Sequence, residues 1–229
     1  MSKKGFTLAE ILITLTIIGV VAALTIPTLL QNTQEAEFKT AMKREFSDLS
    51  QVTLQIKNDV GGSFINAFGG NGDADAENLK NAFKGKLSYI KECSGDTARG
   101  GTGQGSSVEG CWHNIYQWKY LNGSWGGNSI YPGLILSNGT LLVLWDEAGE
   151  SGSACTARDI EACDTLMIDV NGFKKPNVMG KDIFRFWITR DGLKPAGIGG
   201  YWDPASDCNL SNTMGTNKGQ GCAALYLYQ

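Results

Sequence analysis

The distribution of apolar and polar positions separates the first thirty residues from the rest of the chain. The segment from Phe6 to Leu30 is almost entirely apolar, and Glu10 is its only ionisable side chain. As a helix, a segment of this length measures about 37 Å, which is enough to cross a bilayer with some tilt. Lys3 and Lys4 precede it and favour a cytoplasmic location for that end. We therefore expect a transmembrane segment with the rest of the chain outside the cytoplasm.

After Leu30 the helical pattern continues, but with apolar residues on one face only. These residues recur at steps of three or four, which is the period of an amphipathic helix. The stripe consists of Phe38, Met42, Phe46, Leu49, Val52, Ile56 and Val60. Gly61-Gly62 is a helix-ending signal, and Pro27 is expected to bend or loosen the helix. The sequence thus predicts one helix over residues 6–60, with its second half packed on a globular head.

Residues 61–229 predict a globular head that contains both helix and strands. A short helix is expected from Asp75 to about Phe83. The clearest strands lie within Ile130–Trp145, where Asn138-Gly139 separates two apolar runs in the manner of a β-hairpin. Further strands are predicted at residues 165–170, 183–189 and 223–228. A long helix followed by an antiparallel meander predicts an α+β fold with the helix packed on the sheet.

Composition narrows the function. The chain has 229 residues, of which 42% are hydrophobic and 19% charged, and this favours one folded body over disorder. A net charge of −3 gives no general attraction for nucleic acid, so no nucleic-acid partner is expected. His113 is the only histidine, and the sequence lacks the G-x-S-x-G and phosphate-loop motifs. We therefore do not expect an enzyme.

The cysteines indicate disulfides. Their number is even, as expected for a chain in an oxidising compartment, and their spacing does not suit a zinc site. They are Cys93, Cys111, Cys155, Cys163, Cys208 and Cys222. Six cysteines allow 15 pairings, and spacing alone does not choose among them.

Two ordinary explanations of the N-terminal segment leave Glu10 unexplained. One is a secretory signal peptide cut near Ala22 or Ala23, and the other is an uncleaved membrane anchor. A carboxylate at the centre of a transmembrane helix costs about 3 kcal/mol on the insertion scale. Glu10 therefore needs a partner or a purpose.

The sequence GFTLAE at residues 5–10, behind a short basic leader, resembles the processing motif of type IV pilins and type II secretion pseudopilins. The resemblance implies that a membrane peptidase cuts after Gly5 and methylates the new N-terminal amine of Phe6. It also implies that Glu10 pairs with the amine of a neighbouring subunit in a filament. A buried amine and a buried carboxylate are costly alone and tolerable together. Gly19 and Pro27 fall where pilin helices often carry a glycine and a proline.

The resemblance divides the chain into four parts. These are a cleaved leader (1–5), a transmembrane and filament-core helix (6–30), the amphipathic half of that helix (31–60) and the head (61–229). The implied partners are copies of the same chain, other pilins, prepilin peptidase, an inner-membrane assembly platform and, before assembly, membrane lipid. The precursor is then a single-pass inner-membrane protein that becomes a cell-surface filament. The alternatives are a secretion pseudopilin and an anchored surface adhesin that does not polymerise.

Two features of the head also resemble this family. Cys208 and Cys222 bracket a polar loop like the disulfide-bounded C-terminal loop of many type IV pilins. By analogy, Cys93–Cys111 and Cys155–Cys163 would close similar loops. Asp169, Asn171 and Asp182 offer oxygen ligands for calcium, as in some pseudopilin heads. The alternative is a turn-rich connector in which these side chains bond to nearby amides. No other cofactor is expected.

Overall fold

The computed structural model describes residues 5, 7–65, 67–68, 73–94, 110–113, 117–127, 131–145, 155, 161–199, 204–209 and 218–228. Its contacts divide the chain into two units, Met1–Glu37 and Phe38–Gln229. The first helix, α1 (Leu8–Asp59), runs through both.

Helix α1 confirms the predicted long helix. It continues through Pro27 without a break and ends where the glycine pair was predicted to end it. There the amide of Gly62 donates to the Lys57 carbonyl (2.8 Å), and that of Gly61 donates to the Asn58 carbonyl (3.1 Å). Gly61 has a φ of 90°, in the left-handed region that glycine adopts readily. This pair of bonds is the Schellman arrangement, which satisfies carbonyls at a helix end.

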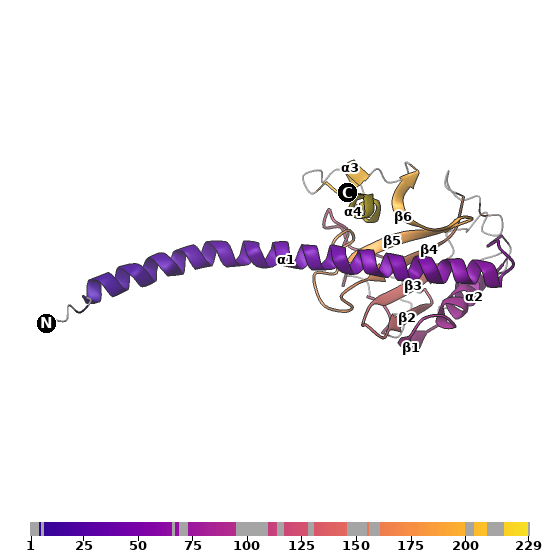
Figure 1. Ribbon diagram of the computed structural model, residues 1–229, viewed down its shortest axis with the longest axis horizontal. Coiled ribbons are helices and arrows are strands. Elements are labelled where there is room, and N and C mark those ends of the chain that lie inside the picture. The colour runs from indigo at the N-terminus through magenta and orange to yellow at the C-terminus, as the bar shows by residue number, and fades with distance from the viewer. Residues whose placement is uncertain are drawn as a thin grey trace. The chain divides into compact units, whose positions relative to one another are not determined.

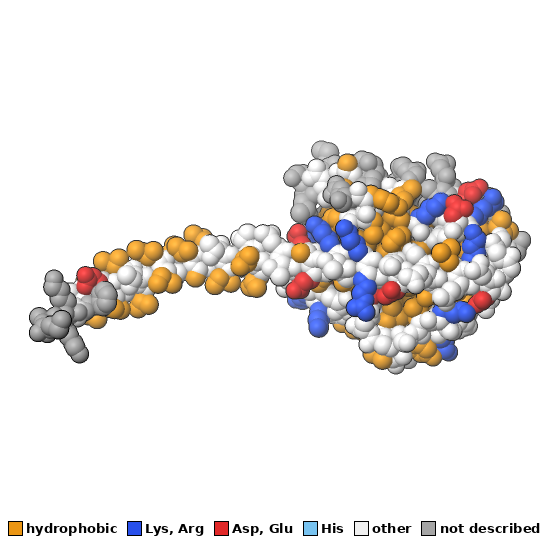
Figure 2. All heavy atoms as spheres, viewed as in Figure 1, with side chains coloured by type: hydrophobic (Ala, Val, Ile, Leu, Met, Phe, Trp, Pro, Cys, Tyr) orange, Lys and Arg blue, Asp and Glu red, His pale blue; other side chains and the backbone are white. Residues whose placement is uncertain are grey.

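In the first unit, the large apolar side chains of α1 are exposed from Leu8 to Leu30, and Figure 2 shows them along one face of the helix. By length and composition this helix is able to cross a membrane. Its threonines fit that environment because their hydroxyls bond within the helix: Thr16 donates to the Leu12 carbonyl (2.7 Å) and Thr25 to the Val21 carbonyl (2.9 Å). A hydroxyl satisfied in this way leaves no unpaired donor in an apolar environment.

In the second unit, the described residues form a six-stranded sheet in the order β1-β2-β3-β4-β5-β6 (Figure 1). The strands are β1 (Tyr89–Cys93), β2 (Gly133–Leu136), β3 (Leu141–Trp145), β4 (Ala162–Asp169), β5 (Ile183–Thr189) and β6 (Gly192–Gly199). Each pairs with its neighbours in antiparallel register. The predicted antiparallel meander and the α+β class are therefore confirmed.

The predicted hairpin joins β2 and β3. The amide of Leu136 donates to the Thr140 carbonyl, and the amide of Gly139 donates back to the Leu136 carbonyl, both at 2.9 Å. Gly139 has a φ of 91°, which a three-residue hairpin turn requires at its last position. The Asn138-Gly139 signal thus predicted the turn correctly.

The C-terminal strand prediction is wrong. Residues predicted as a strand at 223–228 belong to the helix α4 (Cys222–Tyr228). Ala223 and Ala224 are buried, and Tyr226 and Leu227 pack on the same core, which is the spacing of one helix face. Seven residues are too few for the sequence period to separate helix from strand. The other helices are α2 (Asp73–Lys84), which contains the predicted short helix, and α3 (Pro204–Asp207).

Both faces of the sheet are covered within the second unit. On one face, Leu142, Leu166 and Phe186 share a core with α1, α2 and α4, and the Phe46 ring of α1 stacks on Phe186 at 5.4 Å. The alternate strand residues point the other way, as the pleat requires. They pack with residues of the loops before β2 and before β5 in a second core of Trp112, Trp118, Leu141, Val143, Met167, Met179 and Ile183. We call this second side the loop face.

Candidate functional site

The start of α1 holds Glu10 in a capping box with Thr7. The Thr7 amide and hydroxyl both donate to Glu10 Oε2 at 2.8 Å, and the Glu10 amide donates to Thr7 Oγ1 at 3.3 Å. This reciprocal arrangement satisfies amides that the first helical turn leaves without partners. The capped helix begins at Leu8, close to the predicted cleavage position after Gly5.

The other predicted residues of this segment have no packing role inside the described chain. Glu10 is exposed, and the two bonds that it accepts from Thr7 use only one of its carboxylate oxygens. A Cβ added to Gly19 would meet no described atom within 4 Å, so no close contact in the described chain requires a glycine there. Gly5 is exposed, and Phe6 lies outside the described residues. Within the described chain, Glu10 thus bonds only in the capping box of α1, and Gly19 makes no close contact.

The head contains three disulfides, and they join the cysteines in sequence order. The pairs are Cys93–Cys111, Cys155–Cys163 and Cys208–Cys222. The sequence separations are 18, 8 and 14 residues, so each bridge closes a local loop. Local bridges of this kind restrict the unfolded chain and suit a domain that works outside the cell.

Asp169, Asn171 and Asp182 bond to nearby amides. The Asn171 amide donates to Asp169 Oδ1 (3.1 Å), while the amides of Asn177 and Val178 donate to the two Asp182 oxygens (both 2.7 Å). Among the described residues, no group of three or more His, Cys, Asp or Glu side chains is placed to hold a metal ion. Calcium binding by these three residues stays a prediction.

Asp169 also forms a buried pair with the only histidine. His113 Nε2 lies 2.7 Å from Asp169 Oδ2, and both side chains are almost fully buried. Burial lowers the pKa of His113 to about 4, and burial together with the nearby Asp182 carboxylate raises the pKa of Asp169 to about 9. At neutral pH the two side chains therefore share one titratable proton, and the pair carries no net charge.

Next to this pair, the loop face has a cavity of about 710 Å³. It is lined by His113, Gln117, Lys119, Trp125, Phe173, Lys175, Pro176, Asn177 and Val178. Trp125 and Phe173 are half exposed there. The sequence did not predict this pocket, because its lining residues come from segments up to 65 positions apart, from His113 to Val178. The only local signal was the occurrence of aromatic residues and lysines within polar loops.

The comparisons with known proteins identify the N-terminal segment. The family model of the prokaryotic N-terminal methylation motif matches residues 1–26. No curated protein and no solved structure gave a significant match. Residues 1–26 therefore carry the prepilin signature of type IV pilins and pseudopilins, as the sequence predicted.

This signature supports a type IV pilin or pseudopilin precursor that prepilin peptidase processes. Type IV pilins and pseudopilins are structural proteins, and the motif implies assembly with other pilins. The apolar N-terminal helix suits a membrane-anchored precursor that becomes a surface filament. The fold agrees, since a long N-terminal helix followed by an antiparallel sheet is a pilin-like arrangement.

Proposed function

We propose that the mature chain begins at N-methylated Phe6 and polymerises into a type IV pilus-like filament through α1. The observation that carries the proposal is the single carboxylate of Glu10 in an apolar helix whose start lies within the matched methylation motif at residues 1–26. In lipid or in a helical filament core, this charge needs a compensating cation. The N-terminal amine of a neighbouring subunit is a cation that every mature subunit supplies.

The geometry at Glu10 supports this pairing. The Thr7 amide and hydroxyl donate to Oε2, so the capping box orients the carboxylate and leaves Oε1 for an incoming amine. An amine bound there would set the axial register between neighbouring subunits. Transfer of α1 from lipid to a bundle of similar helices changes little hydrophobic energy, because lipid tails are as apolar as the helices.

A type IV pilus subunit fits the head better than a secretion pseudopilin. The Cys208–Cys222 bridge closes a loop near the C-terminus, and the head is larger than a minimal pseudopilin head. The role is structural rather than catalytic. The precursor spans the inner membrane with its head outside the cytoplasm, where disulfides form, and an assembly platform transfers it to the filament.

Mass spectrometry of the sheared surface fraction tests the processing step. The expected N-terminal peptide begins at Phe6 and is heavier by one methyl group than the unmodified sequence. A chain that begins at Met1 would instead be an ordinary anchor, and one that begins near Leu24 would be the product of signal peptidase. Either result would contradict the proposal.

Replacement of Glu10 tests the assembly step. Glu10→Leu is expected to insert in the membrane but to reduce sheared filaments at least tenfold, because the neighbouring amine loses its partner. Thr14→Val, one turn further along α1, is the matched control and should assemble normally. Normal filament yield from Glu10→Leu would show that the carboxylate is not needed for polymerisation. Absence of filaments from the unchanged protein would favour a non-polymerising surface protein.

A further inference from the structure

The pocket on the loop face lies entirely within the second unit, away from the face that packs on α1. Residues of the second core, such as Trp118 and Met179, flank its lining residues in sequence and hold them on the sheet. A cavity of about 710 Å³ is within the usual size of small-ligand sites. It is large enough for one or two sugar rings.

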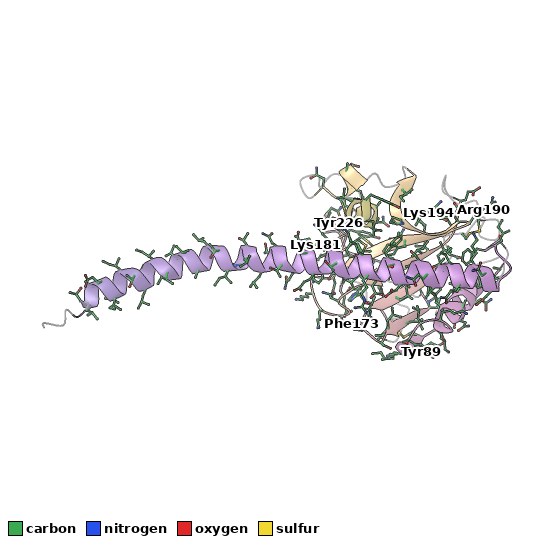
Figure 3. All side chains as sticks on the ribbon, viewed as in Figure 1. Tyr89, Phe173, Lys181, Arg190, Lys194 and Tyr226 are labelled. Carbon is green, nitrogen blue, oxygen red and sulfur yellow. A yellow bond between two sulfur atoms is a disulfide. The ribbon has the colours of Figure 1, made fainter. Side chains whose placement is uncertain are left out.

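Two aromatic rings border this pocket and remain half exposed. Trp125 is 48% exposed and Phe173, labelled in Figure 3, is 50% exposed. Phe173 comes from the loop after β4, and its ring packs edge-on against His113, with centroids 5.5 Å apart. Exposed rings at a concave site are typical of ligand binding, and a π face attracts the polarised C–H groups of a sugar ring.

The pocket is also cationic. Lys119 and Lys175 line it, and the ammonium group of Lys119 lies 4.1 Å from the Trp125 ring centroid. None of the nine described lining residues is acidic. Because its lowered pKa keeps His113 neutral at pH 7, the charge comes from the lysines. A ligand that carries both a negative charge and an apolar ring face matches this combination.

We propose that this pocket binds a carboxylate-bearing saccharide, with the sugar ring against Trp125 and Phe173 and the carboxylate at Lys119 and Lys175. Neither the prepilin signature nor the filament role assigns this site. The aromatic rings and the lysines of the pocket each meet a group that such a sugar carries.

The experiment is a calorimetric titration of the full-length protein in a polyoxyethylene detergent, which carries no sugar headgroup. The probes are D-glucuronate and N-acetylneuraminate, with D-glucose as the neutral match of glucuronate. At least one acidic sugar should bind saturably, and glucose should bind at least tenfold more weakly than glucuronate if glucuronate is the ligand. Lys119→Gln, Lys175→Gln and Trp125→Ala should each weaken binding about tenfold, the size expected for one charge-assisted bond or one stacked ring.

The matched control is Lys174→Gln, which removes an exposed charge next to Lys175 but outside the pocket lining. It should leave affinity within twofold. The proposal is overturned if neither acidic sugar binds saturably, or if the pocket variants bind like the unchanged protein. It is also overturned if a short oligonucleotide binds instead and depends on the lysines but not on Trp125. None of these results bears on filament assembly, so the two proposals fail separately.

Discussion

The N-terminal part of α1 and the head use apolar side chains in opposite ways. In residues 8–37 the side chains of leucine, isoleucine and valine are exposed, as at Leu15 (60%) and Leu24 (72%). In the head, apolar residues of the same kinds, such as Leu142 and Ile188, are fully buried between the sheet and its covering layers. The head is therefore stabilised by its own contacts, whereas the N-terminal part of the helix has apolar surface that no described residue of the chain covers.

This difference also explains where each functional feature lies in the sequence. The processing signal is contiguous, because a peptidase recognises residues 1–10 as a linear segment that does not depend on the packing of the head. The pocket on the loop face exists only after folding, since β4 and β5 bring the loop that contains Phe173 to the segment that contains Trp125. The first feature is readable as a motif, and the second is not.

The largest expected effect comes from comparing the loss of one large apolar side chain in the head with the same kind of change in the first unit. Phe186→Ala removes a fully buried ring stacked on Phe46, so the head should lose about 3–5 kcal/mol of unfolding free energy. Leu15→Ala, at an exposed position of the first unit, should leave head stability unchanged. Thermal unfolding in detergent, followed by near-UV circular dichroism, measures both. Equal losses from the two variants would mean that the regions do not fold independently of each other.

The local sequence signals predicted the elements that depend on neighbours in the chain. α1, its glycine C-cap and the β2–β3 hairpin follow from periodicity and turn chemistry within a few residues. Strand β5 was predicted at residues 183–189 and occurs at Ile183–Thr189, because its apolar run is bounded by turn signals.

The sequence did not predict strands β1 and β6, and for β6 the reason is physical. β6 contains three glycines and Pro195, a composition that disfavours strands, and it forms because β5 supplies a hydrogen-bonding partner, with Phe186 opposite Pro195. β6 is the edge strand, where a proline without an amide donor is tolerated. Tertiary pairing decided this element, and no local pattern contains that information.

The head's disulfides provide the second contrast, since the described part of the first unit has none. Replacement of Cys208 and Cys222 together by serine opens a loop with a sequence separation of 14 residues. The chain-entropy estimate for a loop of this size is about 3 kcal/mol. The double variant should unfold several degrees lower, and its N-terminal peptide should still begin at methylated Phe6. An unchanged melting temperature would show that the bridge does not stabilise the native head.

The His113–Asp169 pair should make head stability depend on pH above neutrality. The pKa of Asp169 is raised from 3.8 to about 9 on folding, so its contribution is lost as pH rises from 3.8 to about 9. The pKa of His113 is lowered from 6.5 to about 4, so its contribution grows as pH rises from 4 to 6.5. The two changes oppose each other between pH 4 and 6.5. Stability should therefore be flat in that range and fall between pH 6.5 and 9.

Asp169→Asn should remove most of that fall, because asparagine does not titrate. Melting temperatures of the variant and of the unchanged protein at pH 6.5 and 9 provide the test. The drop in melting temperature between these two pH values should be smaller for Asp169→Asn. Asp191→Asn is the control. Its hydrogen bond to Lys194 lowers the pKa of Asp191, so this carboxyl is ionised in both states throughout the range. A variant whose melting temperature falls as steeply as that of the unchanged protein would mean that another group causes the dependence.

The smallest effect is expected at Glu45, the one acidic residue buried on the face of α1 that packs on the head. Its Oε1 accepts a bond from Asn138 Nδ2 at 2.6 Å, which joins α1 to the β2–β3 turn. Burial raises the pKa of Glu45 above 4.5, so the folded state loses stability as pH rises through that raised pKa. Glutamine retains an acceptor for Asn138 without the charge.

Glu45→Gln should therefore stabilise the head at pH 8 by about 1 kcal/mol or less, and the gain should disappear at pH 4, where both side chains are neutral. Glu35→Gln, at an exposed position of α1, should change the melting temperature little at either pH. A lower melting temperature for Glu45→Gln at pH 8 would mean that the ionised carboxylate strengthens its bond to Asn138 by more than burial costs. In that case the buried charge of Glu45 would help to fix the register of α1 on the β2–β3 hairpin.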